Sequence, residues 1–104
     1  MCKKELFEKI IEIVSEITEV SREEILSRSR RADVTDARYL VLYILYTHGV
    51  RIYKIAELSG IPCRSVYYAI NSFSMRSDRE GTILNLWIKD VKSRLQKDCN
   101  NSVN

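Results

Sequence analysis

Gly60 divides the stretch from Ile52 to Phe73 into two segments that each show helical periodicity, and this division limits the folds open to the chain. Glycine adopts a positive φ without steric cost, so it can end one helix and let the chain reverse. Pro62 lies where the next helix would start, a position that tolerates its missing N–H. The stretch therefore predicts two short helices joined by a tight turn. The residues expected to be buried recur at helical spacing and are Ile55, Ala56, Leu58, Val66, Ala69, Ile70 and Phe73.

The outward side of the second segment carries mostly hydrogen-bonding side chains. These are Cys63, Arg64, Tyr67, Tyr68 and Asn71. In a helix-turn-helix, the second helix enters the major groove of DNA and its N-terminal part meets base edges. We therefore interpret residues 52–73 as a helix-turn-helix. Because similar patterns occur in helix pairs that bind no DNA, a purely structural hairpin is the alternative.

Positive charge is concentrated in the part of the chain that contains this helix pair. The net charge of the 104 residues is only +3, but residues 28–76 hold seven Arg and one Lys against three acidic residues. Residues 1–27, in contrast, hold seven Glu against four basic residues. Basic charge beside a helix-turn-helix is the footprint expected of phosphate binding. The candidate phosphate or minor-groove contacts are Arg28, Arg30 and Arg31 in a basic loop at 28–34, together with Arg51 and Lys54.

The whole sequence predicts an all-α bundle of five to six helices in a single domain spanning residues 1–104. One proline and three glycines argue against β-rich and disordered classes. Apolar residues recur at three- and four-residue steps outside the helix pair as well, and the segment 36–48 is the most apolar, so we expect it at the centre of the core. Besides the helix pair, we predict helices at 5–20, 22–27, 36–48 and 77–97, and a frayed tail at 98–104. Trp87 in the last helix is expected to anchor the core.

Two of these helices are preceded by side chains that can bind free backbone N–H groups. Ser21 with Glu24 and Ser77 with Glu80 each form a capping box, in which the hydroxyl and the carboxylate both accept from an N–H at the helix start. We expect the first box to open the 22–27 helix and the second to open the last helix.

The central helix at 36–48 is expected to begin at a cap formed by Thr35 or Asp33 and to end at Gly49. Arg38 then falls in its first turn, where the helix dipole disfavours a cation. We therefore expect Arg38 to have an anionic partner, which is either an external anion or a glutamate of the first helix.

Cysteine and histidine usage gives no support for a metal site, a cofactor or catalysis. Cys2, Cys63 and Cys99 are odd in number and far apart, and the only histidine, His48, lies at a predicted helix end. No apolar run is long enough to cross a bilayer, and Glu5 follows the N-terminal lysines too closely for a signal peptide. We therefore expect a cytoplasmic protein that is not an enzyme, takes no cofactor or small-molecule substrate and binds no membrane.

Several of these positions also carry a family resemblance, which runs from about Ile10 to about Leu95. They are the pair Ile10 and Val14, the run Ile25-Leu26-Ser27, Arg28, Arg30, Val34, Arg38, Ile55 and the segment from Gly60 through Val66. In their order and spacing the chain resembles the C-terminal DNA-binding domain of the DnaA replication initiators, a TrpR-like helical bundle. The resemblance implies a helix-turn-helix in the major groove and a basic loop that reaches the adjacent minor groove.

The resemblance implies roles for individual residues as well. Arg30 falls at about the position of the family's minor-groove arginine, Ser65 at that of a hydroxyl residue that holds phosphate, and Arg38 at that of a basic residue of the long helix. The chain departs from the family where the recognition helix starts, with Pro62-Cys63-Arg64-Ser65 in place of Asp-His-Thr-Thr. Asp36 replaces a second arginine, and the phosphate loop of the initiator ATPase is missing.

Two functions from different classes follow from these observations. The first is a stand-alone protein that binds double-stranded DNA in replication or transcription control, with Arg64 reaching guanine O6 and N7. The second is a protein-interaction module that keeps this fold without binding DNA. The replaced signature and the small net charge favour the second, and exposed tyrosines with arginine suit protein interfaces. A homodimer or a protein partner is a further expectation, because a single domain buries only about 600–1,000 Å² on DNA.

Overall fold

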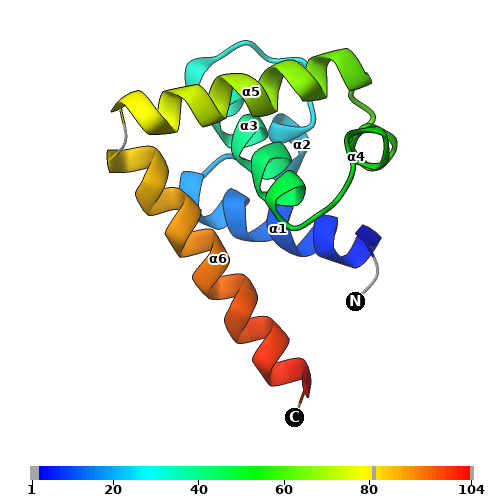
Figure 1. Ribbon diagram of the computed structural model, residues 1–104, viewed down its shortest axis with the longest axis vertical. Helices are drawn as coiled ribbons and strands as arrows, with labels where there is room; N and C mark the ends of the chain where they lie inside the picture. The colour runs from blue at the N-terminus through cyan, green and yellow to red at the C-terminus, as the bar shows by residue number, and fades with distance from the viewer. Residues whose placement is uncertain (1–2, 81, 104) are drawn as a thin grey trace.

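Six α-helices make up the regular structure in the part of the chain that the computed structural model describes. The description covers the backbone of residues 3–80 and 82–103 and the side chains of residues 3–76 and 85–95. The helices are α1 (Lys3–Thr18), α2 (Arg22–Ile25), α3 (Ala32–Thr47), α4 (Ile52–Ser59), α5 (Cys63–Glu80) and α6 (Thr82–Val103). No strand occurs within the described backbone, which confirms the predicted all-α bundle (Figure 1).

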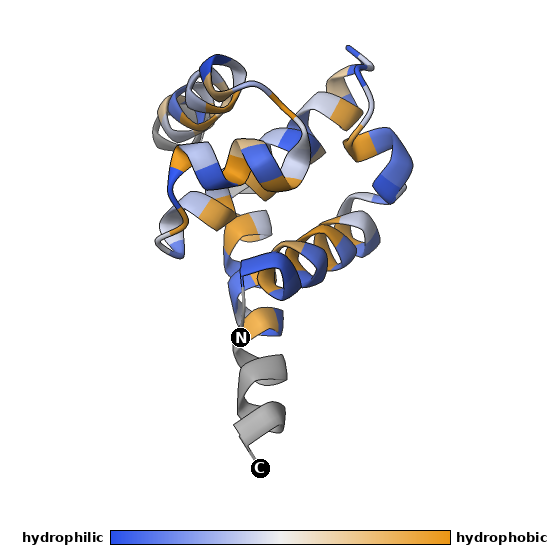
Figure 2. Ribbon diagram, turned by 90° about the vertical axis from the view of Figure 1, so that its right-hand side faces the viewer, coloured by the Kyte–Doolittle hydropathy of each residue, from blue (hydrophilic) through white to orange (hydrophobic). Residues whose placement is uncertain are grey.

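The central position belongs to α3, which lies between α1 on one side and α5 on the other (Figure 1). It packs against each of the other five helices. Seven of its residues are buried, including Leu40, Val41, Ile44 and Leu45, because a helix that is apolar on most of its faces must find packing partners for all of them. Figure 2 shows that apolar and hydrophilic residues both occur along the helices of the bundle. The prediction that this helix forms the middle of the core is confirmed.

The first helix covers one side of α3 and presents its charged side to solvent. Its buried residues are Phe7, Ile10, Ile11, Ile13 and Val14. Glu5, Glu12 and Glu16 are exposed on the other side. This is the amphipathic arrangement that the three- and four-residue spacing predicts. The helix ends at Thr18 because Glu19 adopts a left-handed conformation with φ 60°.

The last helix packs across α1 and closes the bundle. Val91 and Leu95 are buried, and Trp87 is half-buried against the core, as expected of an anchor. Arg94 joins the two helices through an ion pair with Glu16, with Nη1 and Oε2 3.1 Å apart. Within the described residues, no helix combines the length and the apolar character that crossing a membrane requires.

The start of α3 differs from the prediction. The helix begins at Ala32, four residues earlier than expected, and Arg31 occupies the N-cap position without a side-chain capping bond. Neither Thr35 nor Asp33 caps it, because both lie inside the first turns, where Asp33 accepts hydrogen bonds from Arg31 and from the Val34 N–H. Residues 32–34 of the predicted basic loop are therefore helical, and the loop between α2 and α3 spans residues 26–31.

Two predictions near the C-terminus are also wrong. The backbone at Ser77 to Glu80 continues α5, so these residues do not form a capping box that opens the last helix. The last helix runs from Thr82 to Val103, so the described part of the predicted frayed tail is helical. The side chains of these residues lie outside the description, and the backbone bounds alone overturn both predictions.

Candidate nucleic-acid interface

The turn between α4 and α5 has the geometry that its glycine predicts. Gly60 lies in the left-handed region with φ 76°, and its N–H donates to the Ala56 carbonyl at 2.9 Å. The Ser59 hydroxyl donates to the Ile55 carbonyl at 2.7 Å and accepts from the Ile61 N–H at 3.2 Å. These bonds occupy the polar groups that a helix end would otherwise leave unpaired, so the turn is fixed relative to α4.

Helix α5 separates a buried side from an exposed side along its first three turns. Val66, Ala69, Ile70 and Phe73 are buried, and the Phe73 ring lies 5.1 Å from that of Tyr43 in α3, centroid to centroid. The opposite side forms a ridge of exposed residues, which are Cys63, Arg64, Tyr67, Tyr68 and Asn71. This is the division that the sequence predicts, although α5 continues to Glu80 and is therefore longer than the predicted second helix.

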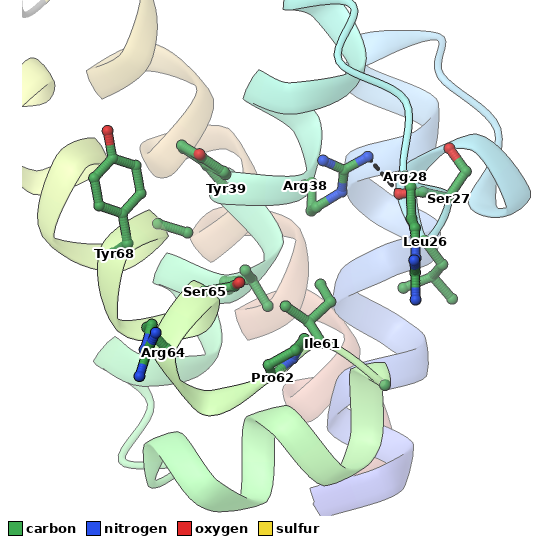
Figure 3. Close-up of a pocket in the computed structure, with 13 residues that line it drawn as sticks. Leu26, Ser27, Arg28, Arg38, Tyr39, Ile61, Pro62, Arg64, Ser65 and Tyr68 are labelled. Carbon is green, nitrogen blue, oxygen red and sulfur yellow. Dashed lines mark hydrogen bonds between the residues drawn. The ribbon is translucent and has the colours of Figure 1, made fainter.

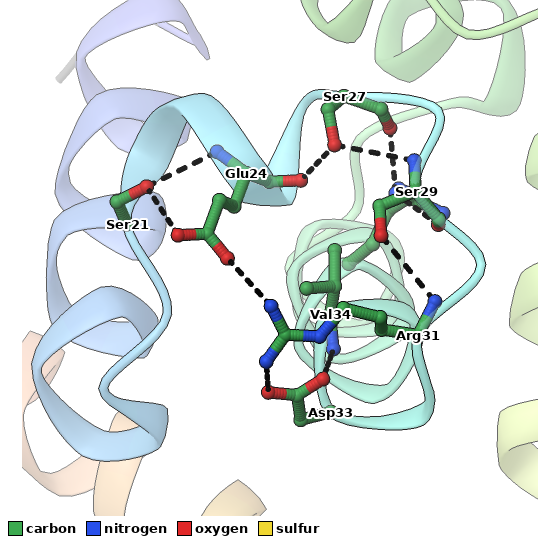
Figure 4. A network of polar contacts seen from close by, with 8 residues as sticks. Ser21, Glu24, Ser27, Ser29, Arg31, Asp33 and Val34 are labelled. Atoms are coloured by element: carbon green, nitrogen blue, oxygen red, sulfur yellow. Dashed lines mark hydrogen bonds and ion pairs between the residues drawn. The ribbon is translucent and has the colours of Figure 1, made fainter.

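The α2–α3 loop is held in place by its own serines (Figure 4). The Ser27 hydroxyl donates to the Glu24 carbonyl at 2.6 Å and accepts from the Ser29 N–H at 3.2 Å. The Ser29 hydroxyl accepts from the Arg31 N–H at 3.3 Å. Short hydroxyl-to-backbone bonds of this kind specify a turn conformation. These three bonds therefore define the conformation of the loop.

Arg38 of α3 holds the same loop from the inside. Its Nε donates to the Ile25 carbonyl at 2.9 Å, and its Nη2 donates to the carbonyls of Ser27 at 2.6 Å and Ser29 at 3.0 Å. Burial lowers the pKa of the guanidinium, and the charge interaction with Tyr39 opposes that shift. The group stays charged because arginine does not deprotonate in proteins.

Both expectations for the partner of Arg38 are therefore corrected. The helix starts so early that Arg38 lies in its second turn, where the dipole argument for an external anion no longer applies. No glutamate of α1 pairs with it among the ion pairs of the described residues. Backbone carbonyls take the place of both.

Apart from Arg38, the cations of the predicted site fall into two groups. Arg31 pairs with Asp33 at 3.0 Å and lies 3.9 Å from a Glu24 oxygen, and Lys54 lies 3.6 Å from Glu57. In the second group, no ion pair or hydrogen bond to another described residue is formed by the side chains of Arg28, Arg30, Arg51 and Arg64. All four are exposed. These four arginines are the ones available to an anionic ligand without breaking a contact.

The capping box at α2 is formed only in part. The Ser21 hydroxyl accepts from the Glu24 N–H at 3.2 Å, as predicted. The Glu24 carboxylate, however, accepts from the Ser21 hydroxyl at 3.5 Å and faces Arg31, so the expected bond from the carboxylate back to the N-cap N–H is replaced (Figure 4). The carboxylate is thereby linked to the basic loop.

A cleft of about 670 Å³ joins the loop to the start of α5 (Figure 3). Arg28 enters it from the loop, Arg38 from α3, and Arg64, Ser65 and Tyr68 from α5. Its apolar lining consists of Leu26, Leu42, Ile61, Pro62 and Ala69. None of the described residues that line it is acidic. Three arginines around a cleft without a carboxylate favour an anionic ligand.

Sequence comparison finds a similarity to a replication initiator protein. The chain is 34% identical over 95 residues to the chromosomal replication initiator protein DnaA of Gloeobacter violaceus, a match that covers 88% of this chain. The chain is DnaA C-terminal-domain-like. It spans only about a fifth, 21%, of the length of that DnaA. No protein-family model matches the chain, and no solved structure matches it.

The DnaA-like chain does not bring all its predicted site residues to the cleft. Of the predicted residues, Arg28, Arg38, Arg64, Ser65 and Tyr68 line it. The rest lie outside it, namely Arg30, Arg31, Arg51, Lys54, Cys63, Tyr67 and Asn71. Sequence analysis missed Tyr39, whose place directly after Arg38 in the most apolar helix was the only available signal.

Proposed function

We propose that this chain binds double-stranded DNA, with α5 in the major groove and the α2–α3 loop at the adjacent minor groove or backbone. The observation that carries the proposal is the cleft, because it places Arg28 of the loop and Arg64 of α5 on one surface without an intervening carboxylate. A duplex strand that separates two grooves needs such a surface beneath it. The similarity to DnaA supports DNA binding in replication at the level of the family.

In this proposal, different candidate residues contact bases and phosphates. Arg64 is exposed in the first turn of α5, where recognition helices meet base edges, so we assign it to guanine. Arg28, Arg30 and Arg51 contact phosphates or the minor groove in this proposal. The remaining contacts come from the hydroxyl of Ser65 in the cleft and from the ridge residues Cys63, Tyr67, Tyr68 and Asn71.

Two of the predicted cations are less suited to this role. Arg31 would have to exchange Asp33, and Lys54 would have to exchange Glu57, before binding a phosphate. An exposed ion pair contributes little free energy in water, so breaking it costs little. The neighbouring carboxylate still repels a phosphate, however, so these two cations add little net attraction for DNA unless that carboxylate moves away. The unpaired arginines therefore dominate the proposed affinity.

The experiment that tests the proposal is a titration of a fluorescently labelled random duplex at several salt concentrations. Three phosphate contacts from Arg28, Arg30 and Arg51 predict that log K falls with log salt at a slope of about −2.7, and five contacts predict about −4.5. Substitution of all three by alanine should flatten the slope. No binding at micromolar protein and low salt would overturn the proposal.

A protein-interaction module is the second candidate, and exposed tyrosines are the observation in its favour. Tyr53, Tyr67 and Tyr68 have 62%, 62% and 65% of their surface exposed. Tyrosine is enriched where proteins meet. A second copy of the chain or another protein is the partner in this case, and either can also supplement the small area that one domain offers to DNA. Under both candidates we propose a cytoplasmic protein that is not an enzyme.

A further inference from the structure

We propose that Arg38 is the positioning residue of the α2–α3 loop, which it holds through three backbone carbonyls so that Arg28 and Arg30 are presented to DNA. Arg38 is half-buried and lines the cleft, and in this role it acts through the loop backbone without a DNA contact of its own. The inference rests on the proposed function because DNA affinity is its readout.

The carbonyls that Arg38 binds come from alternate residues. Ile25 is the last residue of α2, and Ser27 and Ser29 follow it in the loop. Three acceptors from alternate residues can converge on one guanidinium only when the backbone curves around it. A helix end leaves carbonyls unpaired, and a charged donor binds them more strongly than a neutral one. Arg38 therefore stabilises the curvature of the loop as well as the end of α2.

The loop sequence complements this arrangement. In the run Ser27-Arg28-Ser29-Arg30, the serines bind neighbouring backbone groups through their hydroxyls and Arg38 through their carbonyls. Arg28 and Arg30, which alternate with the serines, are exposed and have no partner among the described residues. The alternation thus directs the serine carbonyls to Arg38 and leaves the two arginine side chains exposed.

Arginine is required at position 38 because of the shape of its head group. The acceptors are divided between two nitrogens, with Nε on Ile25 and Nη2 on both serine carbonyls (Figure 3 shows the Ser27 bond). A lysine ammonium offers its donors from a single atom and cannot reproduce this fork. Substitution of Arg38 by lysine keeps the charge and releases part of the loop.

The test compares Arg38→Lys with Arg94→Lys, a matched change in an ion-paired arginine of α6. We expect Arg38→Lys to weaken DNA binding about tenfold or more. The loop would then lose conformational entropy when DNA binds, and this loss would reduce the affinity. We expect Arg94→Lys to bind like the wild type. Trypsin should also cleave the loop after Arg28 and Arg30 several-fold faster in Arg38→Lys than in the control.

A double-mutant cycle separates positioning from direct contact. In a background where Arg28 and Arg30 are both alanine, Arg38→Lys should cause no further loss if it acts through them. An undiminished further loss would show that Arg38 itself touches DNA and would overturn the inference. Equal affinity of Arg38→Lys and the wild type would overturn it as well. If the wild type binds no duplex, the proposed function fails. Faster loop cleavage in Arg38→Lys than in the wild type would still show that Arg38 holds the loop.

A second variant keeps the test valid if Arg38→Lys does not fold. The double substitution Ser27→Ala and Ser29→Ala removes the hydroxyl turns and leaves Arg38 in place. It should reproduce the weaker DNA binding and the faster cleavage. An unchanged affinity together with rapid cleavage would show that loop order is irrelevant to DNA binding and would contradict the inference.

Discussion

Arg76 of α5 donates a hydrogen bond to Asp36 of α3, with Nη1 and Oδ1 2.8 Å apart across forty residues of sequence. Both side chains are partly shielded, with 39% and 24% of their surface exposed. Asp36 stands where the resemblance to the DnaA initiators implies an arginine, so its carboxylate has a structural use in this chain. The pair joins α5 to the central helix beyond the exposed ridge, which ends at Asn71.

Neutralising Asp36 should therefore destabilise the fold. We expect Asp36→Asn to lower the free energy of unfolding by about 1 kcal/mol, because a partly buried charged hydrogen bond becomes a neutral one. Urea denaturation measures this change. Glu57→Gln is the control, since the Lys54–Glu57 pair is wider at 3.6 Å and more exposed. Equal stability of the two variants would contradict a role for Asp36 in joining the helices.

Arg64 and Arg51 should affect DNA binding in different ways. Substitution of Arg64 by alanine should remove about 1–3 kcal/mol of discrimination between a selected site and a random duplex, because a base contact is lost. Substitution of Arg51 should weaken binding to all sequences alike and reduce the salt slope by about 1. Competition titrations with the two duplexes measure both effects. The assignment of roles is wrong if Arg64→Ala weakens both duplexes equally.

Cys63 provides a chemical footprint of the ridge. Its thiol is free and exposed in the first turn of α5, so a maleimide should label it readily in a variant with serine at positions 2 and 99. At a duplex concentration about ten times the Kd, labelling should slow about tenfold, because only unbound protein reacts. Mass spectrometry over time gives the rate. Labelling that ignores the duplex would place the DNA elsewhere on the molecule.

Gly60 and Gly49 form a matched pair for testing the turn. Both lie in the left-handed region, with φ 76° and 86°, and a Cβ would meet no atom within 4 Å at either position. We expect alanine at either position to cost about 1 kcal/mol of stability through backbone strain alone. Only Gly60→Ala should also weaken DNA binding, because Gly60 sets the direction of α5. Thermal unfolding measures the loss of stability in each variant, and the duplex titration measures whether only Gly60→Ala binds DNA more weakly.

Helix positions could be predicted from the sequence because burial imposes a periodicity on the residues themselves. The division of α5 into Val66, Ala69 and Ile70 inside and Tyr67 outside follows from spacing alone. The apolar stripe of α1 was predictable for the same reason, and the reversal at Gly60 was predictable because glycine adopts a positive φ.

The inner structure of the site could not be predicted in this way. Arg38 binds backbone carbonyls, which every residue possesses, so the identity of its partners leaves no mark in the sequence. Asp33 was expected at a helix cap, but the early start of α3 places it inside the first turn, where it accepts from both Arg31 and the Val34 N–H. Helix bounds near the C-terminus depend on packing that local capping signals do not report.

The placement of α3 between α1 and α5 also gives the molecule electrical polarity. Helix α1, on one side of the central helix, carries four glutamates against three lysines, and the unpaired Arg28, Arg30 and Arg64 belong to the loop and α5 on the other side. A long polyanion would be attracted more strongly to the second side than to the first, so the torque on a diffusing molecule would turn it before contact. More collisions would then occur in the orientation that allows binding. Added salt would lower the association rate constant as well as the affinity.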